Sequence, residues 1–380
     1  AQPLDPAAQV LAQPTAVAPH FTDWVIAQLL PEIRARGGVV RSTLDARLQR
    51  LVERRAAEHV AGLRDRSLAE AGAVVLDTAR GEVLAMVGSP AYDADAGQVN
   101  IATRRRHPGS ALKPFVYALA IEHGDNPASI AWDVYDVPSG YWLADQSDRE
   151  HGPVRFREAL AGSYNLAAVH VLEKVGIGSL MTVLGKAHVA ELAGSPEDYG
   201  LRLALGSARV RLIDLAAGYG FLARGGTVTT PNAVVEVVRD DGTRWRPPAP
   251  RVDRVFSART AWLVMDMLAD PAARRPGFGQ ELPVELPFPV AVKTGTSRGF
   301  ADTVAVGVTR EYTVAAWGGN FDGTPTQGLV AMQAAAPLLR DAFLAVADGQ
   351  ALTLPVAPDD VVTREVCALS GQLPSPACPH

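Results

Sequence analysis

The stretch Arg106-His-Pro-Gly-Ser-Ala-Leu-Lys-Pro-Phe115 decides how the rest of the sequence is interpreted. Ser110 and Lys113 are three residues apart, so a helix that begins near Ser110 would place both side chains on one face. Pro114 is compatible with such a helix only in its first turn. We therefore expect Ser110 at a helix N-terminus, where backbone N–H groups and the helix dipole stabilise developing negative charge.

A serine hydroxyl is a weak nucleophile unless a base takes its proton, and Lys113 is the nearest candidate base. The pair alone is weak evidence, because most such pairs are a capping serine and a solvated lysine. The chain has only four lysines, however, beside thirty-two arginines, which cannot deprotonate. Codon bias is the plainer explanation of this ratio, and it suffices for Lys174 and Lys186. Lys113 and Lys293 instead lie in short motifs that carry chemistry.

Two further motifs follow downstream in the chain. Ser163-Tyr-Asn165 is an S-x-N triplet, and Lys293-Thr-Gly-Thr296 is a K-T-G triplet followed by another hydroxyl. Each triplet is weak evidence by itself, but three motifs in this order are strong evidence for a serine-based acyl transfer site.

The composition is that of a chain that can form a globular core. The sequence of 380 residues is 48% hydrophobic, which is enough for a sizeable core. A net charge of −5 gives no electrostatic reason to expect a nucleic acid partner. No uncharged apolar run reaches about eighteen residues, so we expect no transmembrane helix in this sequence.

The histidines show no metal-ligand spacing and no Gly-rich phosphate loop is present, so we expect no metal and no cofactor. His170, seven residues after Ser163, is interpreted as a packed or surface residue.

Hydrophobic periodicity predicts a mixed α and β chain. Helices are expected over residues 21–36, 45–64, 110–123, 155–160, 165–174, 213–222, 258–268 and 329–347, the last interrupted at Pro337. The expected helix caps are Thr22 or Asp23 for the first helix, Asp45 for the second and Ser257 for the seventh, and the expected turn of a hairpin is Asp240-Asp-Gly242. Strands are expected over 39–44, 73–78, 82–87, 234–238, 243–245, 290–294, 303–309 and 312–317. Residues 271–289 are predicted to be a Pro-rich surface loop. The aromatic residues of the segment 124–152 are expected to cover the core rather than line a groove: Trp132, Tyr135, Tyr141 and Trp142.

Both cysteines lie in the last fourteen residues. Cys367 and Cys378 could form a local disulfide, contribute to a zinc site whose other ligands are missing, or remain inert thiols, and we favour the disulfide.

The three motifs resemble those of the transpeptidase domain of class A penicillin-binding proteins. Other stretches that fit are Arg41-Ser-Thr-Leu-Asp45, Gly81 to Pro90, Gly97-Gln-Val-Asn100, Leu205-Gly206, Tyr219, Gly225-Gly226 and Trp317-Gly-Gly-Asn320. The tail from Val366 to Gly371 resembles the start of the C-terminal module of the 1C branch of this family. The sequence departs from the family pattern at Tyr164, a bulky residue inside its triplet, and at Val304, where an aromatic is usual.

This resemblance implies an α+β fold like that of serine β-lactamases and penicillin-binding transpeptidases, with a central antiparallel sheet and helices packed on both faces. It also implies three segments. Residues 1–38 would be a linker and lead-in segment after a glycosyltransferase domain that is absent here. Residues 39–347 would be the transpeptidase domain, and residues 348–380 a Pro-rich linker and the start of a truncated C-terminal module.

The resemblance further implies the roles of the site residues. Ser110 would attack the D-alanyl-D-alanine bond of a peptidoglycan stem peptide, and a neutral Lys113 would take its proton. Ser163, oriented by Lys293, would relay a proton to the leaving amine, and Asn165 would bind the substrate peptide. Backbone N–H groups of Ser110 and Thr296 would form the oxyanion hole. The remaining substrate contacts would come from Thr294, Gly295 and Thr296.

The partners that this implies are stem peptides, β-lactam antibiotics and other cell-wall synthesis proteins, on the periplasmic side of the bacterial inner membrane. Membrane contact would be made only through an anchor outside this sequence.

Three alternatives use the same fold. A D,D-carboxypeptidase or endopeptidase would use water as acceptor, and a non-catalytic sensor or scaffold would not turn over. A β-lactamase would need a deacylating glutamate, and no glutamate between Asn165 and Lys293 has that context: Glu173, Glu191, Glu197, Glu236, Glu281 and Glu285.

Overall fold

A computed structural model describes residues 17–136, 149–280, 282–367, 369–376 and 378. Its centre is a five-stranded antiparallel sheet in the order β12-β13-β14-β2-β3. The strands are β2 (Glu70–Asp77), β3 (Val83–Val87), β12 (Ala291–Thr296), β13 (Asp302–Val308) and β14 (Tyr312–Gly319). The predicted hairpin and the predicted C-terminal meander are therefore both confirmed, and they join side by side through β14 and β2.

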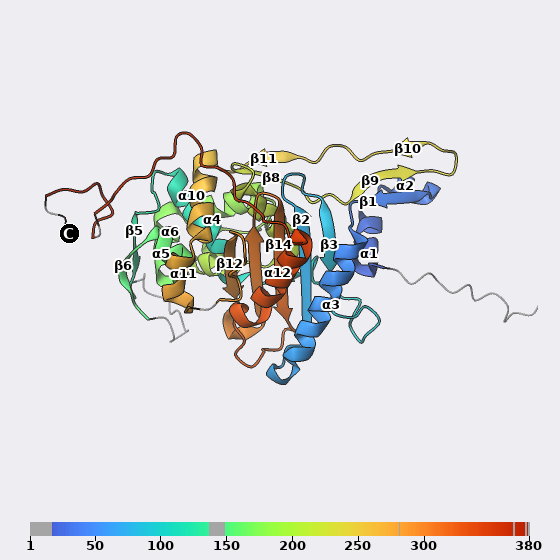
Figure 1. The fold of residues 1–380 in the computed structure, drawn as a ribbon, viewed down its shortest axis with the longest axis horizontal. Helices are drawn as coiled ribbons and strands as arrows, with labels where there is room; N and C mark the ends of the chain where they lie inside the picture. Colours follow the sequence, from blue (N-terminus) through green and yellow to red (C-terminus); the bar gives the residue numbers. More distant parts are fainter. Residues whose placement is uncertain (1–16, 137–148, 281, 368, 377, 379–380) are drawn as a thin grey trace, which may run out of the picture.

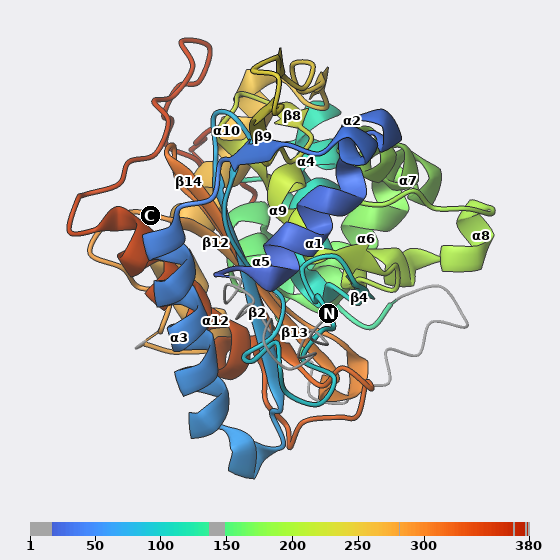
Figure 2. The same ribbon diagram turned by 90° about the vertical axis from the view of Figure 1, so that its right-hand side faces the viewer.

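Helices cover both faces of this sheet, as expected (Figure 2). Helices α3 (Ala46–Gly62) and α12 (Ala331–Ala347) lie on one face and share a hydrophobic cluster with it that includes Val52, Ala335 and Phe343. The other face carries the larger cluster, built around α4 (Lys113–Glu122) and α9 (Leu212–Tyr219). Because strands with two buried faces need mostly apolar residues, the central parts of β2, β13 and β14 are apolar.

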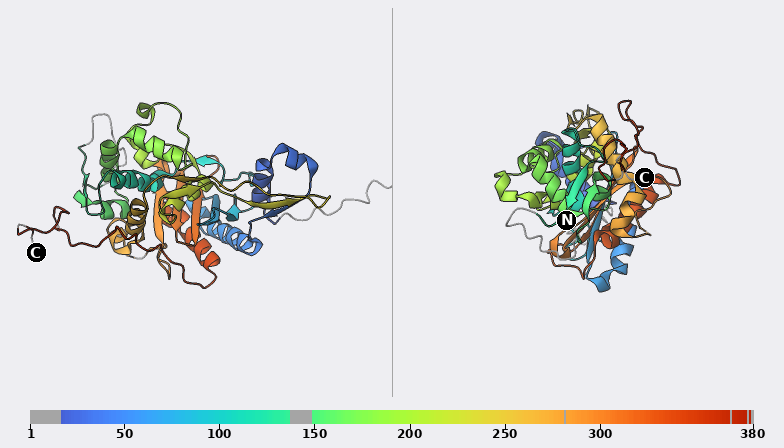
Figure 3. Two further views of the ribbon diagram at one scale, coloured as in Figure 1. Left: turned by 90° about the horizontal axis from the view of Figure 1, so that it is seen from above. Right: turned by 90° about the vertical axis from the view of Figure 1, so that its left-hand side faces the viewer.

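The remaining elements surround this centre. Figures 1 and 3 show a long arm at one end of the molecule, with the C-terminal tail at the other. The arm consists of the N-terminal helices and the hairpin of β9 (Val234–Val238) and β10 (Arg244–Trp245). The other helices are α1 (Pro19–Gln28), α2 (Pro31–Arg36), α5 (Phe156–Ala161), α6 (Asn165–Val175), α7 (Ile177–Lys186), α8 (Pro196–Tyr199), α10 (Ala258–Ala269) and α11 (Pro271–Phe278). The other strands are β1 (Val39–Ser42), β4 (Arg105–Arg106), β5 (Ile130–Asp133), β6 (Gly152–Arg155), β7 (Val210–Arg211), β8 (Thr227–Thr229), β9 (Val234–Val238), β10 (Arg244–Trp245) and β11 (Val252–Arg254). Short 3₁₀ helices are η1 (Arg64–Arg66), η2 (Gly109–Leu112), η3 (Leu201–Leu205), η4 (Gly220–Leu222) and η5 (Arg298–Phe300).

Several local predictions from the sequence are confirmed. The Asp45 carboxylate accepts hydrogen bonds from the N–H groups of Arg47 and Leu48, so it caps α3. Ser257 caps α10 through the N–H of Thr260. The predicted hairpin around residues 240–242 pairs β9 with β10.

Three predictions that concern helices were wrong. The segment 21–36 forms two helices that begin at Pro19 and Pro31, because proline is favoured in the first turn of a helix and disfavoured further along it. Neither Thr22 nor Asp23 is the cap. The helix α12 is not interrupted at Pro337, because the buried residues around that position hold both halves against the sheet. Within the predicted loop 271–289, Asp270 caps the helix α11 by accepting the N–H of Ala273.

The prediction that aromatic residues of segment 124–152 cover the core was wrong for two of them. The Trp132 side chain is 57% exposed and that of Tyr135 is 48% exposed. Tyr141 and Trp142 lie outside the described residues.

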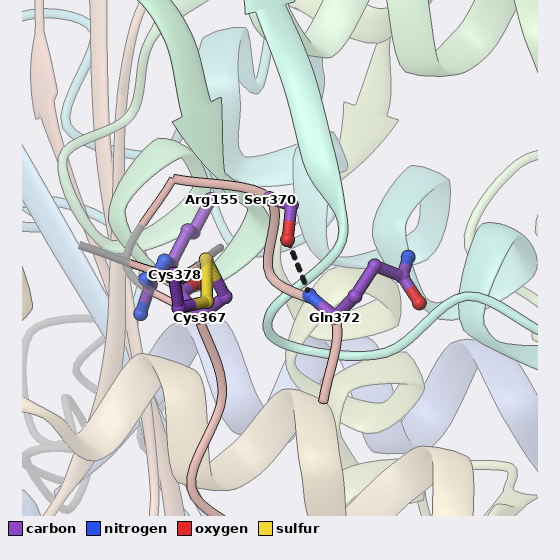
Figure 4. The surroundings of a disulfide bond; sticks show 5 residues. All are labelled: Arg155, Cys367, Ser370, Gln372 and Cys378. Carbon is purple, nitrogen blue, oxygen red and sulfur yellow. Dashed lines mark hydrogen bonds between the residues drawn. A yellow bond between two sulfur atoms is a disulfide. The ribbon is translucent and has the colours of Figure 1, made fainter. Parts of the chain in front are cut away.

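The two cysteines are joined in a disulfide, so the favoured sequence interpretation is confirmed (Figure 4). The bonded tail packs back on the domain, since the Arg155 guanidinium donates a hydrogen bond to the carbonyl of Cys367. The described residues contain no group of three or more potential metal ligands. Over the same part of the chain, no single helix has the length and apolar character needed to cross a membrane; the pair α6 and α7, bent by 92°, meets that criterion only when taken together.

The α3 cap gives a stability prediction. Replacing Asp45 by Ala removes the acceptor of two N–H groups, so we expect Asp45→Ala to lower the free energy of unfolding by about 1 kcal/mol in urea denaturation. Asp45→Asn, which keeps an acceptor, should retain most of that stability. Equal losses in both variants would show that the carboxylate does not act as a cap.

Candidate active site

A buried tyrosine holds the Ser110 turn, which is the short helix η2 (Gly109–Leu112) that carries Ser110. Ser110 lies in η2, and α4 begins at Lys113, so the predicted helix start is confirmed. The Tyr219 hydroxyl donates a hydrogen bond of 2.6 Å to the carbonyl of Ala111. The Lys113 side chain is fully buried, whereas Ser110 stays partly accessible. The serine is therefore presented at the surface of a rigid turn.

Strand β12 reaches this turn at very short range. A Cβ atom at Gly295 would lie 2.0 Å from the carbonyl oxygen of Pro108, and one at Gly109 would lie 2.8 Å from the backbone nitrogen of Thr296. Only glycine permits both approaches, and Gly109 also has the left-handed φ of 55° that glycine adopts readily. The backbone of Thr296 is thereby brought against the turn that carries Ser110.

The second motif places its serine between two lysines. The Lys293 ammonium donates a hydrogen bond of 2.7 Å to Ser163 Oγ, and Lys113 Nζ lies 3.5 Å from the same oxygen. Lys113 also donates to the carbonyl of Ser163 at 2.6 Å, to the carbonyl of Tyr164 at 3.0 Å and to Asn165 Oδ1 at 2.6 Å. The three motifs thus converge in space although they are far apart in the chain.

The electrostatics of this cluster are unfavourable for two full positive charges. Burial lowers the pKa of Lys293 well below its ordinary value, and the nearby cations of Lys113 and Arg274 lower it further. The sequence interpretation instead assigned the neutral amine to Lys113. In this arrangement Lys113 faces three acceptor oxygens, a set that matches the three N–H donors of an ammonium group.

Arg274 is a member of the site region that sequence reasoning missed. It lies on α11, in the segment predicted to be a surface loop, yet it is 4% exposed. Burial lowers its pKa as well, and its guanidinium donates to the carbonyl of Leu268. The sequence signal that could have found α11 is the Asp270-Pro271 pair followed by Gly279, which is a typical helix start and stop.

The predicted substrate-binding residues lie on an edge strand. β12 is the outermost strand of the sheet next to β13, so its other edge is available for an added strand. Thr294 is 6% exposed, and the Thr296 hydroxyl accepts a hydrogen bond of 2.9 Å from the N–H of Ala331 at the start of α12. The hydroxyl of Thr296 therefore keeps its own proton to donate.

A second group of residues joins the segment before Ser110 to strands β13 and β14. Trp317 donates to Asp302 Oδ1 at 3.0 Å, and Arg106 lies 5.5 Å from the Trp317 ring centroid and 3.9 Å from the same carboxylate. Arg106 also donates to the carbonyl of Phe321, so it ties the segment before Ser110 to the sheet. His170 contacts the carbonyl of Val134 and the Glu173 carboxylate, in line with its interpretation as a packed residue.

This arrangement can carry acyl transfer. It combines a surface hydroxyl on a helix start, two amines that share a second hydroxyl, and backbone N–H groups on a strand against the nucleophile turn. A carbonyl between the Ser110 turn and Thr296 would meet the nucleophile and the hydrogen-bond donors together.

Comparisons of this chain with a family profile and with known proteins point to the same protein family. The profile described as penicillin binding protein transpeptidase domain matches residues 71–319. The chain is 34% identical to penicillin-binding protein 1C of Escherichia coli over 80% of its length and 38% of that protein's. It is 31% identical to penicillin-binding protein 1A of Aquifex aeolicus over 66% of its length and 34% of that relative's. The chain therefore spans well under half the length of these curated relatives.

Solved structures share the fold. Penicillin-binding protein 1A of Haemophilus influenzae superposes with a TM-score of 0.79 at 17% identity, over 95% of this chain and 75% of the other. The PonA1 protein of Mycobacterium tuberculosis, solved in complex with penicillin V, superposes with a TM-score of 0.72 at 22% identity, over 90% and 94% of the two chains.

The close approach of β12 generates one prediction. A methyl group at Gly295 would meet the Pro108 carbonyl at 2.0 Å, so we expect Gly295→Ala to lower the free energy of unfolding by about 1–3 kcal/mol in urea denaturation. Gly185→Ala is the matched control, because nothing lies within 4 Å of its Cβ position on α7 and alanine favours a helix. A Gly295→Ala protein as stable as the control would contradict the packing described here.

The lowered pKa of Lys293 generates a pH prediction. Between the folded pKa and the unfolded value of about 10.4, the unfolded chain binds a proton at Lys293 that the folded chain does not. The stability contributed by this group therefore rises with pH across that window and is flat above it. The stability of the wild-type chain relative to Lys293→Met should rise from pH 7 to pH 10 in urea denaturation. Lys186→Met, at an exposed lysine, is the control, and its stability difference from the wild type should not change with pH. A stability difference between the wild type and Lys293→Met that also does not change with pH would contradict the lowered pKa.

Proposed function

Because this chain belongs to the penicillin-binding protein transpeptidase family, we propose that it is a serine D,D-transpeptidase that cross-links peptidoglycan stem peptides. The observation that carries this proposal is the hydroxyl of Ser163, which contacts both Lys293 and Lys113. Such a network can move a proton from a nucleophile to a leaving amine within one buried cluster.

The first chemical step forms the acyl-enzyme. Ser110 Oγ attacks the carbonyl carbon between the last two D-alanines, and its proton passes to Lys113. Lys113 must be neutral to act as this base, so in the reactive state the positive charge shared by the two lysines lies on Lys293. The peptide C–N bond then breaks, and the proton reaches the departing D-alanine nitrogen through Ser163, which Lys293 orients at 2.7 Å.

The substrate is held along β12. The oxyanion would accept hydrogen bonds from the backbone N–H groups of Ser110 and Thr296, an effect worth about 3 kcal/mol per donor in other enzymes. The terminal carboxylate would meet the hydroxyls of Thr294 and Thr296, and the amide of Asn165 would bind the peptide. Gly295 lets the stem peptide lie close enough to β12 to pair as an added strand.

The second step resolves the acyl-enzyme. An amine from another stem peptide attacks the Ser110 ester, the new amide bond forms as the C–O bond breaks, and the proton returns to Ser110 through the same network. β-Lactams would acylate the same serine, because they present a strained amide where the substrate presents a peptide bond. The PonA1 complex with penicillin V is an example of a family member that binds such a drug.

The β-lactamase alternative lacks an observation in its favour. Among the six glutamates between the second and third motifs, Glu191 and Glu197 are exposed, and Glu281 lies outside the described residues. The other three are in ion pairs elsewhere, Glu173 with His170, Glu236 with Arg41 and two further arginines, and Glu285 with Arg275. A carboxypeptidase would use the same residues with water in place of the amine.

We also propose the segment boundaries and the location that the sequence suggests. Residues 1–38 lead into the transpeptidase domain of residues 39–347, and residues 348–380 begin a further module. The disulfide in that tail suits an oxidising compartment such as the bacterial periplasm, where peptidoglycan is assembled.

The nucleophile assignment gives the direct functional prediction. Intact-mass spectrometry after incubation with a fluorescent penicillin should show one stable adduct on the wild-type chain and none on Ser110→Ala. Lys113→Gln should slow adduct formation by roughly 100-fold or more, because it removes the proposed base. Lys174→Gln is the matched control, since that lysine pairs with Asp125 on the surface.

The contradictory outcomes are distinct. An adduct that persists on Ser110→Ala would refute the nucleophile. A wild-type adduct that disappears within minutes with release of hydrolysed drug would favour the β-lactamase alternative.

A further inference from the structure

The serine of the second motif has a strained backbone. Ser163 has a φ of 64°, in the left-handed region that residues with a side chain seldom adopt. The helix α6 that follows it begins at Asn165, and the residue before it, Tyr164, provides no side-chain cap. The conformation that holds Ser163 Oγ between the two lysines must therefore be stabilised from outside the motif.

A buried carboxylate on a neighbouring strand supplies the missing cap. Asp133, at the end of β5, is 2% exposed. Its Oδ1 accepts a hydrogen bond of 3.0 Å from the N–H of Ala167, in the first turn of α6. A carboxylate at a helix N-terminus is stabilised by the helix dipole as well as by that bond. Asp133 therefore fixes where α6 begins, and with it the residues just before the helix.

The same carboxylate holds a histidine. His151 Nδ1 lies 2.6 Å from Asp133 Oδ2, and the backbone N–H of His151 donates to the same oxygen at 3.2 Å. With both contacts made to one buried oxygen, the imidazole has a fixed position although its side chain is 34% exposed.

That imidazole lies flat against the ring of Tyr164. The two ring centroids are 3.9 Å apart and the planes differ by 2°. Burial raises the pKa of Tyr164, and the carboxylates of Glu158 and Asp133 raise it further, so the ring is a neutral phenol at neutral pH. The tyrosine is thus a stacking partner rather than a base. Tyr164 is also the residue at which this sequence departs from the family pattern.

We propose that His151, held by Asp133 and stacked on Tyr164, is a positioning residue that keeps the strained Ser163 between Lys113 and Lys293 during acylation. The proposal rests on the proposed function, since acylation is the step it serves. His151 itself contacts none of the reacting groups, so its effect is transmitted through Tyr164. Removing the stack should let the loop relax from its left-handed conformation and withdraw the Ser163 hydroxyl from the lysines.

The test is a double-mutant cycle on the stack. Acylation of the whole chain by a fluorescent penicillin is followed at a series of drug concentrations for His151→Ala, Tyr164→Leu and the double variant. We expect His151→Ala to lower the maximal acylation rate by roughly 10- to 100-fold, because small displacements of catalytic groups have effects of that size. The half-saturating concentration should change far less. The double variant should be no slower than the slower single variant.

The matched control is His188→Ala. His188 contacts an Asp253 carboxylate oxygen at 2.8 Å, a pair of the same kind between the end of α7 and strand β11, away from the three motifs. This control should acylate like the wild type. Additive losses in the cycle, or a wild-type acylation rate in His151→Ala, would overturn the positioning role.

A second readout keeps the inference separate from the proposed function. Amide hydrogen exchange in residues 160–168 should become faster in His151→Ala and stay unchanged in His188→Ala. If the wild-type chain forms no adduct, the proposed function fails and exchange decides the inference. Faster exchange confined to that segment supports the positioning role, and unchanged exchange overturns it.

Discussion

Two buried lysines and one hydroxyl set the conditions that the rest of the site must satisfy. Lys113 and Lys293 both contact Ser163 Oγ, and both side chains are almost completely buried. Burial is the main reason that the pKa of Lys293 is lowered, and repulsion from the like charge of Lys113 lowers it further. A buried pair of lysines is unfavourable unless the surrounding structure holds both side chains in place. Groups with strongly shifted pKa values are concentrated at functional sites.

The surroundings come from three separate parts of the fold. Strand β12 carries Lys293 against the Ser110 turn through a contact that glycine alone permits at Gly295. Helix α4 carries Lys113 from the other side of that turn, anchored by the Tyr219 hydrogen bond to Ala111. The β5–β6 hairpin, through Asp133, caps the helix that follows Ser163.

The sequence predicted the parts of this arrangement that depend on local chemistry. The start of the helix at Ser110, the caps Asp45 and Ser257, and the paired strands follow from turn residues, capping residues and apolar periodicity. The errors had two sources. Pro337 lies inside a continuous helix because packing on the sheet overrides a local rule. The helix starts at Pro31 and Pro271 were missed although local start signals mark them. The Asp133–His151 pair joins residues on either side of a hairpin, and no spacing rule connects them to Tyr164.

The most direct test of the active site is a crystal structure of the chain after reaction with a penicillin. We expect continuous density from Ser110 Oγ to the opened drug, with its carbonyl oxygen between the backbone N–H groups of Ser110 and Thr296. Ser163 Oγ should remain in contact with Lys293. An adduct on another residue, or a carbonyl oxygen that points away from β12, would contradict the assignment of both the nucleophile and the oxyanion hole.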